Sequence, residues 1–348
     1  MVTEKPVIAY SSRLQPPKYS LESSKAEELR LIADCRNSTF LQFNDIIGLP
    51  RKDGRPLPIF DYEKDIVKAI LQHRNVWIKK ATGLGITELV LRVMVWLALV
   101  DNRFRGHRMH IVTGPRINIA VELIGRIKRM FVDKYPSLIF ETDYVTAEVN
   151  GCTIQAFPSH TVDTMRAYTD VSFMFADEAD FFPPGQQTEM RDVIERYRIK
   201  SNPYIVMVST PNKPGGLFEK MENESTSKYY RLKLDYTYGI GKIYDAAFLE
   251  AEKQEEYFER EYNLKYLGKV GNVFRFSDIS RCVMEAGHGE RVRAQALSNA
   301  ALGQSIGIDP GFGGSAFGVA VTAYADGKVV VLEAEEYERT SYEEALAK

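Results

Sequence analysis

Three groups of residues along this chain have types and spacing that could do chemistry together. The first is a glycine-containing loop, Lys80–Thr87. The second is the acidic pair Asp177 and Glu178, and the third is the segment Ser209–Asn212. Each group directly follows an apolar, strand-like run, so each is expected at the carboxyl end of a buried strand, where open α/β sheets place their ligands. Together the three groups predict a nucleotide-hydrolysis site.

The glycine-containing loop keeps part of the phosphate-loop pattern G-x-x-x-x-G-K-[ST]. Gly85 and Thr87 keep their places, whereas Lys80 replaces the first glycine and Ile86 replaces the lysine. Backbone N–H groups and the start of the next helix would hold phosphates, and the Thr87 hydroxyl would hold Mg²⁺. Lys80 can supply the missing charge by reaching back across the loop; Lys79, still in the strand, is the alternative donor. The residues expected to bind ATP here are Lys80, Ala81, Thr82, Gly83, Leu84, Gly85, Ile86 and Thr87.

The acidic pair has the order that hydrolysis of a phosphoanhydride requires. Asp177 would hold Mg²⁺ through water, and Glu178 would position and deprotonate the attacking water. Two solvated acids at a strand end would also fit the local sequence, and so would a plain glycine turn at the phosphate loop. The presence of both motifs on one chain favours the catalytic interpretation.

Further candidates surround these motifs. Ser209, Thr210 and Asn212 stand where a γ-phosphate sensor would couple hydrolysis to movement, although the same residues also suit a turn. Arg166 precedes the acidic strand and would contact phosphate or transition-state charge; it could equally be a surface arginine.

An adenine site is suggested upstream of the phosphate loop. There Tyr62 offers an aromatic ring for stacking and Glu63 a polar group for reading the base. An amphipathic helix that starts with Asp61 as its cap would explain the same residues.

Composition narrows the class of protein. The chain has 348 residues, 45% of them hydrophobic and 26% charged, with a formal net charge of −2. These are the values of a globular protein without a global basic field. The three cysteines form no C-x-x-C pair, which predicts reduced thiols in a cytosolic setting. The amino terminus lacks the hydrophobic core that a signal peptide has. The most hydrophobic stretch is shorter than the ~20 residues that a membrane span needs.

Strand and helix patterns alternate from residue 76 to residue 208, which predicts a largely parallel sheet with helices on both faces. A charged helix is expected over Asp245–Tyr266, and an antiparallel hairpin over residues 316–335. The alternating segments are strands Val76–Lys79, Met109–Thr113, Thr153–Phe157, Val171–Ala176 and Tyr204–Val208, with helices Thr87–Val100, Ile117–Lys134 and Gln187–Arg198.

In their order and spacing, these motifs resemble those of the large terminase subunit of tailed viruses and proviruses. The resemblance rests on the deviant phosphate loop with Lys80 at its entrance, Phe173–Ala179, Val208–Asn212 and the stretch around Arg166. A Glu- and Tyr-rich helix, Glu255–Tyr262, and the strand Ile306–Gly311 resemble the approach to the family's nuclease and its first strand.

The resemblance implies an α/β fold: a P-loop NTPase of the additional-strand catalytic-glutamate type, then the start of an RNase H-like nuclease. The implied regions are an arm (1–40), an ATPase domain with a small helical subdomain (41–270), a connector (271–300) and the beginning of the nuclease (301–348). The implied cofactors are ATP and Mg²⁺. The implied partners are double-stranded DNA, a portal protein, a small terminase subunit and further copies in a ring, in the host cytoplasm and without a membrane.

Three positions depart from the family pattern. Thr82 stands where many members carry an arginine, and Glu63 where a glutamine often reads adenine. Asp309 is the one nuclease acid that matches, and the chain ends at Lys348. A two-metal nuclease using Mg²⁺ or Mn²⁺ needs several converging carboxylates, so we expect nuclease activity only of a complete domain.

Three functional hypotheses follow. The first is an ATP-driven motor that translocates duplex DNA into a procapsid and grips it through its phosphates, with the basic stretches Arg103–Arg108 and Arg126–Arg129 as contacts or as ordinary solvated faces. The second is a helicase-like, DNA-dependent ATPase, against which the Asp309 unit argues. The third is a non-hydrolysing, nucleotide-binding provirus remnant, motivated by Ile86.

Overall fold

The computed structural model describes residues 21–138, 143–267, 290, 294, 304–309, 317–325 and 328–337. The chain divides into two compact units, Met1–Val270 and Gly271–Lys348. Each unit is described by itself.

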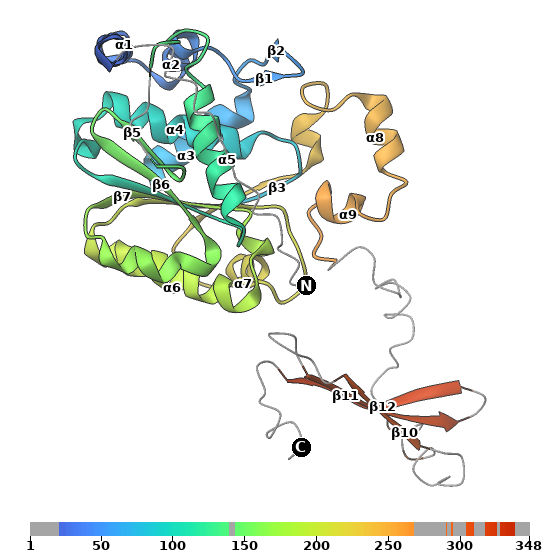
Figure 1. Ribbon diagram of the computed structural model, residues 1–348. Helices are drawn as coiled ribbons and strands as arrows, with labels where there is room; N and C mark the ends of the chain where they lie inside the picture. Colours follow the sequence, from blue (N-terminus) through green and yellow to red (C-terminus); the bar gives the residue numbers. More distant parts are fainter. Residues whose placement is uncertain are drawn as a thin grey trace, which may run out of the picture. The chain divides into compact units, whose positions relative to one another are not determined.

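The first unit is built on a seven-stranded sheet with the strand order β5-β6-β4-β7-β8-β3-β9 (Figure 1). All neighbouring strands are parallel except β5 and β6, which pair antiparallel at one edge. The central strands are apolar and buried on both faces, as parallel strands covered by helices must be. The strands are β3 (Asn75–Lys80), β4 (Arg108–Thr113), β5 (Thr146–Val149), β6 (Cys152–Pro158), β7 (Val171–Asp177), β8 (Tyr204–Ser209) and β9 (Tyr230–Leu234).

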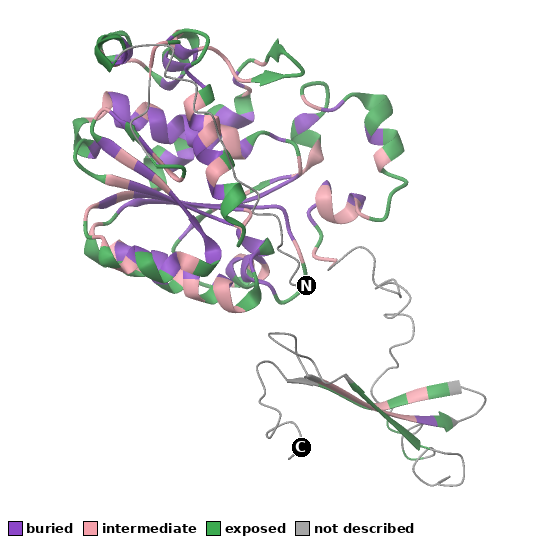
Figure 2. Cartoon of the chain, viewed as in Figure 1, coloured by how far each residue is buried: buried purple, intermediate pink, exposed green. Residues whose placement is uncertain are grey.

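Two helical layers cover the sheet. Helices α3 to α5 pack on one face, with α1 and α2 packed on α4 on the same side, and α6 and α7 pack on the other face (Figure 1). The buried residues lie along both interfaces, which makes the sheet the centre of the core (Figure 2). The helices are α1 (Leu21–Cys35), α2 (Phe40–Ile47), α3 (Asp61–His73), α4 (Ile86–Val100), α5 (Ile117–Arg129), α6 (Pro184–Lys200) and α7 (Leu217–Asn223).

Helix α4 is the apolar helix that the sequence places after the phosphate loop. It begins after Gly85, whose left-handed backbone (φ +77°) favours glycine. Residues on all sides of α4 are buried, which explains its nearly uniform hydrophobicity. In the part of the chain that the structure describes, no helix is both long enough and apolar enough to cross a membrane.

The alternation predicted from the sequence is confirmed, but several boundaries and one helix were wrong. The helix expected over Asp245–Tyr266 is two short helices, α8 (Ala246–Glu252) and α9 (Phe258–Glu261), joined by a turn. Its aromatic side chains pack on one another in a compact cluster around Tyr244 and Tyr262 instead of along one helix face. Helix α5 ends at Arg129, five residues before the predicted end, and the chain continues in turns.

Helices α2 and α7 and strand β5 are among the elements that were missed from the sequence. Helix α2 starts at a capping box in which Thr39 and Gln42 exchange hydrogen bonds, a signal that the sequence does contain. Strand β5 has four residues at the sheet edge and only weak alternation. The loop before α3 also holds a two-stranded ribbon, β1 (Arg51–Lys52) and β2 (Arg55–Pro56).

The second unit contains an antiparallel sheet with the order β10-β11-β12. Its strands are β10 (Gln304–Asp309), β11 (Phe317–Ala325) and β12 (Lys328–Tyr337). The hairpin predicted from the sequence is therefore confirmed as β11 and β12. The proposed connector, residues 271–300, lies outside the described residues except for positions 290 and 294.

Candidate active site

The three sequence motifs meet at the carboxyl ends of β7, β8 and β3, which are consecutive in the sheet. Parallel strands end at the same edge, so residues far apart in sequence become neighbours there. The phosphate loop leaves β3, the acidic pair ends β7, and Ser209 ends β8.

The backbone of the phosphate loop is fixed from outside the loop. Gly83 and Gly85 both have φ of +77°, the left-handed conformation that glycine adopts without strain. The Ala81 and Thr82 N–H groups donate to the carbonyl oxygens of Leu234 and Glu261, at 2.7 and 2.8 Å. The Tyr244 hydroxyl donates to the Thr82 carbonyl. Thr82 is thus held from both sides by the segment that follows β9.

The candidate metal ligands lie in contact. The Thr87 hydroxyl donates to Asp177 Oδ1 at 2.8 Å, and Asp177 is buried. Burial and the neighbouring Glu178 charge raise the pKa of the Asp177 carboxyl to about 6. A hydroxyl and a carboxylate are oxygen donors of the kind that Mg²⁺ takes together with substrate phosphates, so the residues fit the ion. No group of three or more His, Cys, Asp or Glu side chains suited to a metal occurs among the described residues.

Lys80 connects the loop with the other two motifs. Its Nζ donates to Glu178 Oε1 at 2.5 Å and to Thr210 Oγ1 at 3.0 Å. The second Glu178 oxygen accepts the Thr210 N–H at 3.1 Å. Lys79 points elsewhere: its Nζ pairs with Glu222 at 2.6 Å. Of the two lysines, only Lys80 reaches the acidic pair.

Glu178 itself has a left-handed backbone, with φ of +52° and ψ of +42°. A non-glycine residue in this region costs free energy, and such residues concentrate at functional sites. The conformation ends β7 and turns the carboxylate toward Lys80 and Thr210.

Asp180 is a buried residue that the sequence reasoning missed. Its carboxylate accepts the Asn212 N–H at 2.8 Å and the Phe218 N–H at 3.0 Å, and its carbonyl accepts from the Asn212 side chain. Its own N–H donates to Ser209 Oγ at 3.2 Å. Asp180 therefore joins the end of β7 to the coupling segment and to the start of α7. The sequence did contain a signal for it, since Asp180 is the third acidic residue after the apolar run of β7.

Tyr62 and Glu63 lie at the start of α3, beside the phosphate loop. The Tyr62 hydroxyl donates to the Leu84 carbonyl at 2.9 Å, and its ring stacks on Phe60. Glu63 Oε2 accepts the Phe60 N–H at 2.8 Å. Burial raises the pKa of the Glu63 carboxyl to about 7. The structure thus brings both residues to the loop, where Tyr62 supports its backbone.

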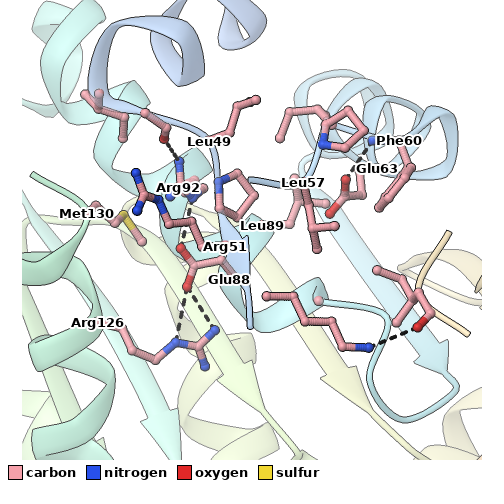
Figure 3. A pocket seen from close by; sticks show the side chains of 18 of the residues that line it. Leu49, Arg51, Leu57, Phe60, Glu63, Glu88, Leu89, Arg92, Arg126 and Met130 are labelled. Atoms are coloured by element: carbon pink, nitrogen blue, oxygen red, sulfur yellow. Dashed lines mark hydrogen bonds and ion pairs between the residues drawn. The ribbon is translucent and has the colours of Figure 1, made fainter. Parts of the chain in front are cut away.

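A cavity of about 580 Å³ lies beside the phosphate loop (Figure 3). Phe60 and Glu63 line one side, Gly83–Gly85 form part of its wall, and Glu88 and Arg126 line the other side. Glu88 follows Thr87 directly and accepts hydrogen bonds from Arg92 and Arg126. The sequence reasoning did not connect these three charged residues with the site, because they lie on two different helices.

Two further predicted residues belong to other elements. Arg166 lies in the 3₁₀ helix Ser159–Ala167, pairs with Asp163 at 2.6 Å and contacts Lys200 at the end of α6. Asp309 is the last residue of β10 in the second unit, and its side chain lies outside what is described. The roles of both residues stay predictions.

Comparisons with known proteins address the fold. No protein-family profile and no curated protein sequence matches the chain. The structure is similar to the large terminase of bacteriophage HK97, with a TM-score of 0.51, 14% sequence identity, and coverage of 87% of this chain and 66% of that one. The chain therefore spans about two thirds of the length of that protein.

Two further solved structures are similar. The ATPase domain of the large terminase of Thermus phage P74-26 gives a TM-score of 0.46 at 14% identity, with 66% of this chain and 99% of that chain covered. The large terminase of a thermophilic bacteriophage, in complex with ADP, gives a TM-score of 0.47 at 11% identity. The match covers 81% of this chain and 69% of that chain.

The fold expected from the sequence is confirmed: the chain has an α/β fold with the mostly parallel sheet of P-loop ATPases, as in the HK97 large terminase, and a small antiparallel sheet after it.

Proposed function

We propose that this chain, which has the fold of a phage large terminase, is an ATP-hydrolysing motor subunit that moves double-stranded DNA into a viral procapsid. The observation that carries the proposal is the convergence of Lys80, Thr87, Asp177, Glu178 and Thr210 at one edge of the sheet. Each of these residue types has a defined task in phosphoryl transfer, and together they make one site.

The residues of the site divide the chemistry of hydrolysis. ATP supplies the bond to be cleaved, and Mg²⁺ bound with it neutralises phosphate charge. Thr87 and Asp177 would hold the ion, and loop N–H groups at the start of α4 would hold phosphate oxygens. Glu178 would orient water and accept its proton. Lys80 would move from Glu178 toward the phosphates, which leaves the Glu178 carboxylate available as a base.

Coupling to movement would run through the segment after β8. Thr210 touches both Lys80 and Glu178, so a change in either side chain alters its hydrogen bonds. Asn212 and the start of α7 are tied to Asp180, two residues after Glu178. A change at the nucleotide would therefore be passed to α7 through hydrogen-bonded groups.

The assembly expected for such a motor is a ring of copies on a portal protein, with a small terminase subunit and duplex DNA as partners. In a ring, Arg166 could serve the site of a neighbouring copy, as an arginine finger supplied in trans. The sheet β10-β11-β12 would be the beginning of an RNase H-like nuclease, with Asp309 as its first acid; Mg²⁺ or Mn²⁺ cleavage would require the remaining acids.

Steady-state ATP hydrolysis, with and without duplex DNA, tests the proposal. Glu178→Gln keeps the size of the side chain and removes the base, so we expect turnover to fall by about 10²–10⁴-fold while Mg·ATP still binds. Glu250→Gln, the same change on the exposed face of α8, is the matched control and should leave turnover unchanged.

The outcomes separate the hypotheses. Turnover that depends on Glu178 and rises with duplex DNA supports the motor. Turnover that rises with single-stranded DNA alone would support the helicase-like ATPase. Binding without turnover, with portal and DNA present, would overturn the proposal in favour of the non-hydrolysing module.

A further inference from the structure

The phosphate site lacks the cation that its loop would normally provide. Ile86, at the lysine position, is buried in the core with 1% of its surface exposed. Lys80 is already bound to Glu178 and Thr210. A bound polyphosphate would carry several negative charges into a site that also holds Asp177 and Glu178. One lysine does not balance them.

Arg126 places a second cation at the same site, from a different helix. It projects from α5 toward the first turn of α4 and lines the cavity together with Gly83–Gly85 (Figure 3). Its Nε and Nη2 donate to Glu88 Oε2 at 3.2 and 2.9 Å. Glu88 is the residue after Thr87, so the guanidinium is held next to the candidate metal ligands.

The electrostatics agree with this placement. The positive charge of Arg126 acts on the buried Asp177 carboxylate, so the guanidinium lies within electrostatic reach of a candidate metal ligand. Two of the three guanidinium nitrogens face Glu88, and Nη1 has no hydrogen-bond partner among the described residues. The side chain is 29% exposed, so a ligand in the cavity can reach it.

The neighbouring Arg92 shows what a purely structural arginine looks like here. It is buried, and its Nη1 donates to Asn44 Oδ1 and to the Gly48 carbonyl, both at 2.8 Å. Its Nε donates to Glu88 Oε1 at 2.9 Å. Arg92 therefore fixes the Glu88 carboxylate against α2, and Glu88 in turn orients Arg126. Two cations share one anion, which leaves the group with a net positive charge.

We infer that Arg126 binds the β- and γ-phosphates of the nucleotide and supplies from α5 the charge that Ile86 cannot. Glu88 is the positioning residue for this contact. The inference rests on the proposed function, since it concerns the same nucleotide site. An arginine fork suits phosphate oxygens, because it offers planar, charged donors in pairs.

Nucleotide binding measured by titration calorimetry tests this assignment on the full chain with Mg²⁺, using ATP, ADP and AMP as ligands. Arg126→Ala should weaken ATP and ADP by about tenfold or more, since a charge-assisted hydrogen bond is lost. AMP, which has neither of those phosphates, should bind nearly unchanged. Arg126→Lys keeps the charge without the paired donors of the guanidinium. Its affinities for ATP and ADP should lie between those of wild type and Arg126→Ala.

Arg196→Ala is the matched control. It removes the same side chain from an exposed position on α6, outside the residues that line the cavity. We expect its nucleotide affinities to stay within about twofold of wild type. Thermal unfolding without nucleotide shows whether each variant is folded. Arg126→Gln, which keeps a polar but shorter side chain without the charge, replaces Arg126→Ala if that variant does not fold.

Several results would overturn the inference. If Arg126→Ala and Arg196→Ala weaken ATP binding equally, only a general electrostatic field acts. If Arg126→Ala weakens AMP as much as ATP, the residue serves the fold or the nucleoside. Wild-type protein that binds ATP without hydrolysing it would contradict the proposed function but leave this contact measurable, and wild type that binds no nucleotide would overturn both.

Discussion

At the scale of single residues, the site is a set of charges that stabilise one another, and two of them, Lys80 and Asp177, are buried. The Lys80 side chain is 8% exposed and the Asp177 carboxylate is buried. The Glu178 side chain is 39% exposed, so water reaches its end of the pair, whereas the buried Lys80 ammonium is costly to leave without a partner. The Lys80–Glu178 contact therefore gives way most easily when a phosphate replaces Glu178 as the partner of Lys80.

Glu63 yields a prediction about pH. Burial, opposed by the Phe60 N–H group and by Arg92 and reinforced by Glu88, raises the pKa of this carboxyl to about 7. The folded protein thus holds the Glu63 proton more tightly than the unfolded chain does. This group's contribution to the free energy of unfolding must fall as pH rises from about 4.5 to about 7.

Glu63→Gln removes this titration and keeps a group that accepts from the Phe60 N–H. We expect the variant to gain stability relative to wild type as pH rises through this window, by about 1–3 kcal/mol at pH 8. Urea unfolding between pH 4 and pH 8 measures it. Glu122→Gln, an exposed change of the same kind on α5, should follow the wild-type curve; a Glu63→Gln curve parallel to wild type would refute the prediction.

At the scale of elements, the junction between β7 and α7 is the tightest part of the site. Asp180 ties the loop after β7 to Asn212 and to the first turn of α7. Gly216 caps α7 at this point, and a Cβ atom there would lie 2.7 Å from Asp180 Oδ1 and 3.1 Å from the Lys213 carbonyl. Only glycine fits without moving the buried carboxylate.

We therefore expect Gly216→Ala to lower the free energy of unfolding by about 1–3 kcal/mol, as overpacking does. It should also slow hydrolysis, because a displaced Asp180 disturbs Ser209 and, two residues upstream, Glu178. Thermal unfolding and ATP turnover of the same preparation measure the two effects.

The control for Gly216→Ala is Gly125→Ala, inside α5. Its nearest neighbours would be atoms at the flexible end of Arg129, and alanine is a better helix former than glycine by about 0.5–1 kcal/mol. This control should be as stable as wild type or more stable. A Gly216→Ala protein that matches it in stability and turnover would show that the close approach to Asp180 has no consequence.

At the scale of the whole molecule, the order of elements was predictable and the long-range contacts were not. Apolar runs that end in polar residues predicted β3, β7 and β8. Because these strands are parallel, their carboxyl ends lie at the same edge of the sheet. That rule alone places Thr87 near Asp177. The position of Arg126 beside Glu88 depends on how α5 packs on α4, which no local pattern in the sequence specifies.

The helix expected over Asp245–Tyr266 failed for a related reason. The segment is rich in charged residues, which favoured a single helix. In the structure its aromatic side chains pack around Tyr244 instead. The Tyr244 hydroxyl donates to the Thr82 carbonyl. The decisive partner of that segment is the phosphate loop, which lies far away in the sequence.

The net charge of the molecule leads to a last prediction. With a formal charge of −2, the protein has no overall attraction for DNA, so duplex binding must come from a local cationic surface that releases counterions. Two charges of the nucleotide site, Lys80 and Asp177, are buried, so this site should be less sensitive to salt. Between roughly 50 and 200 mM KCl we expect DNA stimulation of ATP turnover to disappear while basal turnover changes by less than about twofold. Turnover measured across this series, with and without a duplex, tests the prediction.

If stimulation by DNA persists at high salt, contacts other than those with the phosphate charges hold the DNA. If basal turnover falls together with the stimulation, the salt acts on the nucleotide site instead.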